Sequence, residues 1–202
     1  GDAPRIKDAT YVWRSESSVS AAMVATGEAD LAFSIAPQDA TDPTMDKVYP
    51  NSETAMFRLS ADIPPLNDVR VRKAINLAID RQAFLGSIVS DQAELAEQQV
   101  GPSVLGHNPN LKPWPYDPAQ AEALLAAAKA DGVPVDTEIR MIGRPAMFAN
   151  SSEFVEAAAE MLRSVGLNIK LESLEMTQWL EMANKPFAAD RAPNVFLTMH
   201  DN

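Results

Sequence analysis

The 202-residue sequence contains no cysteine. The chain can therefore form neither disulfides nor thiolate metal sites, and it has no cysteine nucleophile. Long apolar runs are also missing, since no uncharged stretch approaches the ~20 residues that a membrane-spanning helix requires. The sequence does not open with a signal peptide, as expected for a mature secreted protein or for a piece of a longer chain.

Basic residues are few, with 17 Lys and Arg against 28 Asp and Glu and a formal net charge of -11. They are scattered along the chain. Because a nucleic-acid binder needs clustered Lys and Arg to displace counterions from phosphates, we expect no nucleic-acid partner. The hydrophobic fraction of 46% and the charged fraction of 22% are instead typical of a soluble globular chain with a sizeable core.

Motifs for catalysis or for a metal are absent from the sequence. The only two histidines, His107 and His200, match no metal-ligand spacing. The sequence also has neither a Gly-x-Ser-x-Gly elbow nor a Gly-rich phosphate loop. We therefore expect a binding protein with no catalytic residue, metal or cofactor. A hydrolase with a cryptic acid/base pair and a protein-interaction domain with an exposed apolar patch are the alternatives from other classes.

Apolar residues alternate between strand and helix patterns, which favours an α/β layered fold. The strongest helix pattern follows Asn67 or Asp68, where apolar residues recur at the spacing of one buried face. Asp117, Pro118 and Gln120 form a helix start with a capping box, and Asn150 with Glu153 repeats that pattern. Helices are expected at 18–26, 68–79, 84–89, 118–131, 151–165 and 177–183. Strands are expected at 9–14, 31–35, 54–59, 137–142, 167–171 and 195–199. The segment 99–116 is rich in Pro and Gly and is expected to be a surface loop.

Two charged residues each follow a predicted strand. Arg144 comes just after the strand 137–142, and Asp201 comes just after the strand 195–199. Ligands of open α/β sheets bind outside the carboxyl ends of the strands. An Arg in that place can clamp a carboxylate with two parallel hydrogen bonds, and an Asp can hold an ammonium group. Solvated surface residues are the ordinary alternative for both.

Residues 63–84, IPPLNDVRVRKAINLAIDRQAF, resemble the signature stretch of the peptide/nickel family, family 5, of extracellular solute-binding proteins. Three further segments resemble that family in the same order and spacing. They are the Gly-Glu-x-Asp segment in 25–31, the Tyr-Asp-Pro helix start in 116–125 and the Val-Gly-x-x-Ile strand entry in 165–169. The resemblance covers essentially the whole chain.

The resemblance implies part of a two-lobed type II periplasmic-binding-protein fold. Residues 1–50 would be an incomplete segment that returns through the first lobe and hinge, and 51–202 an incomplete second lobe. The implied protein is a periplasmic or extracytoplasmic monomer that captures peptides or peptide-like solutes for an ABC permease. The same receptor role for an opine, a sugar or a nickel complex is the alternative within the family.

The resemblance also implies roles for individual residues. Arg144, in an Arg-Pro pair before a long helix, matches the family's ligand for a peptide carboxylate. Asp201 matches its ligand for the peptide α-amine, in a Trp-x-x-Asp pattern in which Thr198 stands here in place of the Trp. Met147, Thr198 and His200 are secondary candidates because they lie close to these two residues in the sequence.

Overall fold

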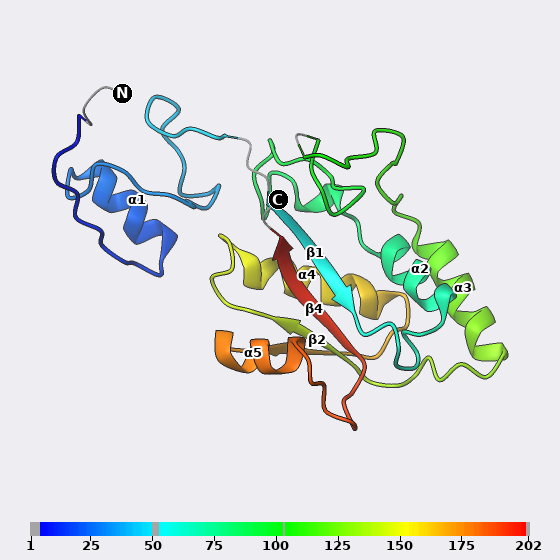
Figure 1. The fold of residues 1–202 in the computed structure, drawn as a ribbon. Coiled ribbons are helices and arrows are strands. Elements are labelled where there is room, and N and C mark those ends of the chain that lie inside the picture. The colour runs from blue at the N-terminus through cyan, green and yellow to red at the C-terminus, as the bar shows by residue number, and fades with distance from the viewer. Residues whose placement is uncertain (1–4, 50–52, 103, 201–202) are drawn as a thin grey trace.

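A mixed four-stranded sheet with helices on both faces forms the body of the protein (Figure 1). The computed structural model describes residues 5–49, 53–102 and 104–200. Within them the strand order is β1-β4-β2-β3, which confirms the α/β fold that the sequence predicts. The strands are β1 (Thr54–Leu59), β2 (Ile139–Gly143), β3 (Ile169–Ser173) and β4 (Asn194–His200). The helices are α1 (Ser17–Ala25), α2 (Val69–Ala78), α3 (Pro118–Ala130), α4 (Ser151–Ser164) and α5 (Met176–Ala183), with a 3-10 turn η1 (Gln82–Phe84).

The strand directions bring the carboxyl ends of three strands to one edge of the sheet, called the functional edge below. β2 runs parallel to both β3 and β4, whereas β1 is antiparallel to β4. The carboxyl ends of the three parallel strands therefore meet at one edge, at Gly143, Ser173 and His200. The antiparallel β1 starts at this edge, since Thr54 is the register partner of His200.

One face of the sheet packs against α4 and holds the larger core cluster, whose sheet members include Met141 and Leu197. The paired helices α2 and α3 contribute to the same cluster. The apolar stripe predicted for α2 is confirmed. Val71, Ala74, Ile75 and Ala78 are all buried, with exposed fractions of at most 2%. In the described part of the chain, no helix has the length and apolar character needed to cross a bilayer.

The opposite face of the sheet carries a smaller cluster. It consists of the buried residues Ile142, Trp179, Ala183 and Phe196. Ile142 and Phe196 are register partners on the neighbouring strands β2 and β4. Trp179 and Ala183 come from α5, which lies across this face in front of the sheet in Figure 1.

Two of the three capping residues predicted above make the expected side-chain bond, but the capping box at Asp117 is incomplete, because the backbone N–H of Asp117 donates to the carbonyl of Leu77. The side chain of Asp68 accepts a hydrogen bond from the backbone N–H of Arg70, and that of Asp117 accepts one from Gln120. The prediction for Asn150 is wrong. Its backbone is left-handed, with φ of 62°, and its side chain makes no capping bond.

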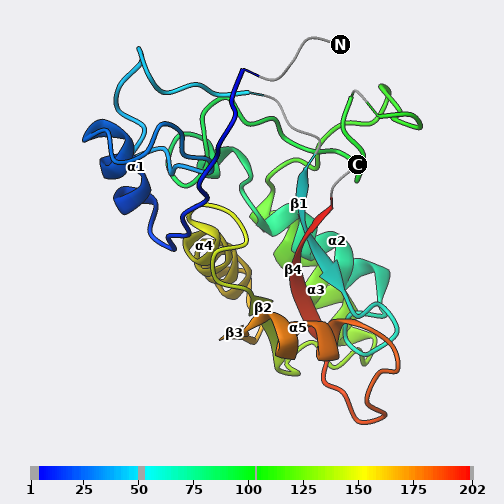
Figure 2. The same cartoon turned by 60° about the vertical axis from the view of Figure 1, so that its left-hand side comes forward.

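The predicted strands at 9–14 and 31–35 are also wrong. Both segments are irregular, and within the described residues neither pairs with a strand. A strand needs a hydrogen-bonding neighbour, and an aromatic, β-branched composition cannot supply one. Residues 5–49, with α1, instead form a layer outside the sheet, as two views agree (Figure 1, Figure 2). Tyr11 and Trp13 are 95% and 89% exposed in this layer.

The helix expected at 84–89 is replaced by the turn η1 and a tight loop. Gly86 adopts a positive φ of 73°, a conformation that ends a helix. Its backbone N–H donates to the carbonyl of Val89, and the N–H of Val89 donates to the carbonyl of Phe84. These two hydrogen bonds close a tight loop, so the apolar residues of 84–89 form a turn and not a helix. The loop predicted at 99–116 contains no helix or strand among its described residues, which confirms that prediction.

Candidate functional site

Arg144 lies at the functional edge, one residue beyond the end of β2. The last register pair between β2 and β4 is Ile142 with Phe196. Continuing this register by two residues places Arg144 beside Thr198. Because side chains alternate between the two faces of a strand, both residues belong to the face that α5 covers. By this extension of the register, two of the residues that the sequence singled out fall on the same face at this edge.

The turn that carries Arg144 is fastened to the start of α4. The hydroxyl of the buried Ser151 donates to the carbonyl of Arg144 and accepts from the backbone N–H of Met147, both at 3.3 Å. Gly143 packs against the same helix, since a Cβ on it would lie 3.4 Å from Cγ2 of Val155. Ala146, inside the turn, has a positive φ of 54°. Both ends of the turn are therefore held by one short segment of helix.

The side chain of Arg144 extends toward α5. Its guanidinium carbon lies 5.8 Å from the centre of the Trp179 ring, and Nη1 contacts the sulfur of Met176. Among the described residues, no carboxylate lies within ion-pair distance of this guanidinium. Arg58, Arg72 and Arg81 likewise have no carboxylate within ion-pair distance in the described part of the chain, whereas Arg70 and Arg140 are paired with carboxylates. Arg144 is half-buried as a residue, but the contact that its guanidinium makes is exposed, so this group can reach an external anion.

The other predicted site residues have different surroundings. Met147 is buried in the larger core cluster, with an exposed fraction of 9%, so its side chain serves packing. Thr198 is 4% exposed, and its hydroxyl donates to the carbonyl of Met56 at 3.4 Å. His200 is half-buried at the end of β4. Asp201 lies outside the described residues, so its role stays a prediction.

The sequence pattern singles out neither Trp179 nor Arg58 as a site residue. In the structure the guanidinium carbon of Arg58 lies 5.9 Å from the Trp179 ring centre and 5.4 Å from that of Phe196. Arg58 also donates to the carbonyl of Ala183 at 2.6 Å, at the end of α5. Strand alternation puts Arg58 on one face of β1. Only the pairing with β4 identifies that face as the one that carries Phe196.

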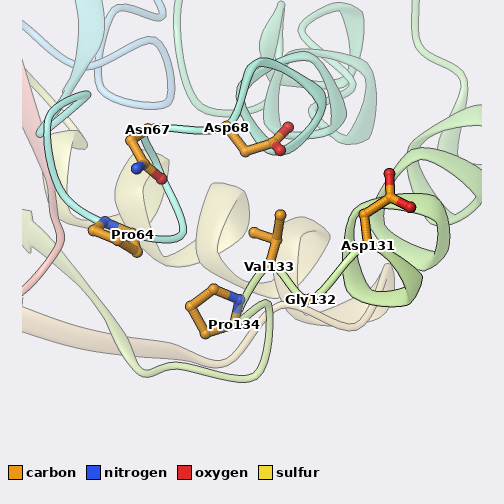
Figure 3. A pocket seen from close by; sticks show the side chains of 7 residues that line it. All are labelled: Pro64, Asn67, Asp68, Asp131, Gly132, Val133 and Pro134. Atoms are coloured by element: carbon orange, nitrogen blue, oxygen red, sulfur yellow. The ribbon is translucent and has the colours of Figure 1, made fainter.

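Two surface hollows lie away from Arg144. One, of about 340 Å³, lies between the start of α2 and the end of α3 (Figure 3). Its two carboxylates, on Asp68 and Asp131, are both paired with Arg70. A second hollow, of about 330 Å³, runs along α1. Within the described residues, no group of three or more His, Cys, Asp or Glu could hold a metal ion. The hollow in Figure 3 is lined by Pro64, Asn67, Asp68, Asp131, Gly132, Val133 and Pro134.

A comparison with protein families finds a match over residues 1–192. The matching family is described as bacterial extracellular solute-binding proteins, family 5 middle. The match covers β1, β2, β3 and the turn that carries Arg144, and it ends just before β4.

Similar curated proteins include a di/tripeptide-binding protein 2 from Pseudomonas aeruginosa. It is 27% identical over 184 residues, which make up 87% of this chain and 33% of that protein. The nickel-binding periplasmic protein of Escherichia coli is 27% identical over 191 residues, covering 85% of this chain and 36% of that protein. The chain thus spans about a third of the length of these relatives.

Among solved structures, NikA from Brucella suis in complex with Fe(III)-EDTA superposes on 92% of this chain and on 40% of its own length. The TM-score is 0.72 and the sequence identity 24%. This likeness concerns the fold, which is part of a two-lobed periplasmic-binding-protein fold.

Proposed function

The chain belongs to family 5 of the bacterial extracellular solute-binding proteins, and we propose that the whole protein captures short peptides for uptake through an ABC permease. One observation carries the peptide assignment. A guanidinium without a carboxylate partner among the described residues lies at the sheet edge where ligands of α/β folds bind. The name of the Pseudomonas aeruginosa relative, a di/tripeptide-binding protein, supports the same substrate class.

The chemistry proposed for the site follows from the two ends of a peptide. Arg144 clamps the terminal carboxylate through two parallel hydrogen bonds, and Asp201 holds the α-amine. Each pair is stronger in a closed, water-poor cleft than in bulk water, because the local dielectric is lower. The separation of the two charged residues then selects the length of the peptide.

The proposed domain organisation places residues 1–50 in the connection from the first lobe through the hinge, and 51–202 in the second lobe. The irregular layer formed by residues 5–49 supports this division, since it lies outside the sheet (Figure 2). Its contacts with the sheet body include a reciprocal amide pair between Gln38 and Asn150, at 3.0 and 3.1 Å. In the whole protein, a ligand would be enclosed between the two lobes.

The protein would act in the periplasm as a monomer and would release its ligand unchanged. The nickel-binding periplasmic relative supports this compartment. A nickel complex is the second candidate ligand, because that relative is 27% identical to this chain, as is the di/tripeptide-binding one. The sequence identity to these two relatives therefore does not distinguish a peptide from a nickel complex as the ligand. The surroundings of Arg144 favour the peptide.

The decisive experiment is a thermal-shift screen of the full-length protein with dipeptides, tripeptides, opines, sugars and nickel. Wild type is compared with Arg144→Ala and with Lys73→Ala, which removes an exposed positive charge from α2. A peptide shift that is lost in Arg144→Ala and kept in Lys73→Ala is expected. A shift with sugar or nickel alone, or a peptide shift that is indifferent to Arg144→Ala, would contradict the proposal.

A further inference from the structure

We propose that Trp179 is a positioning residue, which orients the guanidinium of Arg144 for a ligand carboxylate. The inference rests on the proposed function, because it assumes that Arg144 binds the carboxylate. Trp179 itself touches no ligand in this arrangement. It acts through the contact between its indole ring and the guanidinium, 5.8 Å from ring centre to guanidinium carbon.

The position of the indole is fixed by its own packing. Trp179 is only 9% exposed and belongs to the smaller core cluster. Its ring meets the ring of Phe196 edge-on, with centres 5.9 Å apart and planes at 80°. Phe196 in turn sits on the central strand β4, beside Ile142 of β2. The indole ring, held by Phe196 and Ile142, therefore fixes the position of the Arg144 guanidinium relative to the sheet.

The carboxyl end of α5 is fastened independently of Arg144. Arg58 of β1 donates to the carbonyl of Ala183, the last residue of α5. A cation at this end also interacts favourably with the helix dipole. The guanidinium of Arg58 lies 5.9 Å from the centre of the same indole ring. The helix that carries Trp179 thus stays in place when Arg144 is altered.

The contacts of Arg144 with α5 leave it able to bind an anion. A guanidinium on an aromatic face keeps its N–H donors in its own plane, where a carboxylate can accept two of them. The sulfur of Met176, the neighbour of Nη1, is a weak acceptor that a carboxylate readily replaces. The pair of contacts therefore restricts the orientation of the side chain and does not compete strongly for its hydrogen bonds. A flexible arginine would lose more conformational entropy on binding.

The test compares how strongly each variant prefers a free carboxylate. The affinities of the full-length protein for dialanine and trialanine are measured beside those for the corresponding C-terminal amides. The ratio of the acid affinity to the amide affinity is the readout, because a general folding defect weakens both and leaves the ratio unchanged. The variants are Trp179→Leu, Trp179→Met, Trp179→Phe and Arg144→Ala. Leu174→Ala is the matched control, since Leu174 packs against the same cluster and the change keeps both the indole and the Phe196 ring.

In wild type the acid is expected to bind far more tightly than the amide, and Arg144→Ala removes the preference. Trp179→Leu should lower it by ~10-fold, the scale of a partly desolvated cation–π contact. Trp179→Phe, which keeps a ring, should restore most of it, and Leu174→Ala should keep it. Trp179→Met serves the same purpose if the Leu variant fails to fold.

The outcomes separate the two proposals. If wild type binds neither peptide, or binds acid and amide equally, the carboxylate clamp fails and the role of Trp179 fails with it. If wild type prefers the acid through Arg144, but the non-aromatic Trp179 variants keep the full preference, only the positioning role is overturned. An equal loss in Leu174→Ala would likewise overturn it in favour of general packing.

Discussion

Glu172 of β3 accepts hydrogen bonds from two nitrogens of the Arg140 guanidinium on the neighbouring strand β2, one of them from Nε at 2.9 Å. The residues are diagonal neighbours, because the register pairs Arg140 with Lys170 and Ile142 with Glu172. Lys170 adds a second cation, with Nζ 3.2 Å from the carboxylate of Glu172. The ion pair lies on the sheet face that α5 covers, and Arg140 comes four residues before Arg144 in the chain.

The Arg140–Glu172 pair predicts an acid-sensitive contribution to stability. Hydrogen bonding from Arg140 lowers the pKa of Glu172 from the ordinary 4.5 to about 2. A depressed folded-state pKa stabilises the fold above the unfolded-state value, and this stabilisation is lost as the pH falls through the folded-state value. Glu172→Gln should therefore be less stable than wild type at neutral pH, with a difference that shrinks between about pH 4.5 and about pH 2.

Urea unfolding across this pH range measures the difference. Glu138→Gln is the control, because Glu138 is 53% exposed and its nitrogen–oxygen distance to Lys170 is 4.0 Å. A gap between wild type and Glu172→Gln that stays constant down to the acid limit would contradict the assignment.

Ser151→Ala should loosen the turn that carries Arg144. The change leaves the carbonyl of Arg144 and the N–H of Met147 without their shared hydroxyl. Losing a buried partner costs about 1–3 kcal/mol in free energy of unfolding. We also expect weaker binding of peptide acids to the full-length protein. Ser152→Ala, at the exposed neighbouring position, should change neither quantity, and calorimetric titration with urea unfolding measures both.

Leu162→Ala should be among the most damaging single changes in the core. Leu162 of α4 is fully buried in the larger cluster, with an exposed fraction of 0%. Truncating a buried Leu to Ala costs about 2–5 kcal/mol, because contacts are lost and a cavity is left. Leu105→Ala offers the same chemical change at full exposure and should alter stability by less than about 0.5 kcal/mol. Equal effects of the two changes would show that α4 is not packed as described.

Asp117→Ala tests the start of α3. The carboxylate of Asp117 accepts from the N–H of Gln120 at 2.9 Å, and its loss should cost about 1 kcal/mol in free energy of unfolding. Asp117→Ser keeps an acceptor and should recover most of that loss. Chemical denaturation of the three proteins gives the comparison, and a Ser variant as unstable as the Ala variant would argue against capping.

Local patterns predicted much of the fold. The stripe of α2 and the caps at Asp68 and Asp117 depend on residues within one or two helical turns, so their spacing alone identifies them. The boundaries of the strands were predicted less accurately than those features of the helices. The strand expected at 167–171 is observed at Ile169–Ser173. Its start is set by parallel pairing with Ile139 on β2, which neighbours in the sequence do not encode.

The surroundings of the candidate site could not be predicted in this way. The position of Arg144 at a strand end followed from the order of strand and turn. The contact of its side chain with Trp179, 35 positions later in the chain, depends on α5 crossing the face of β2 and β4. The strand predicted at 9–14 was wrong for a different reason. Its composition suits a sheet, but no described strand pairs with it.

The unequal thickness of the two layers that cover the sheet has a consequence for amide hydrogen exchange. α5 is secured mainly by the four buried residues of the smaller cluster, whereas α2, α3 and α4 share the larger one. Segments with few buried apolar contacts open at lower free energy than the whole domain. The amides of α5 should thus exchange through sub-global opening, ahead of those in α4. Each such opening would also take the guanidinium of Arg144 away from its two side-chain neighbours, because Met176 and Trp179 both belong to α5.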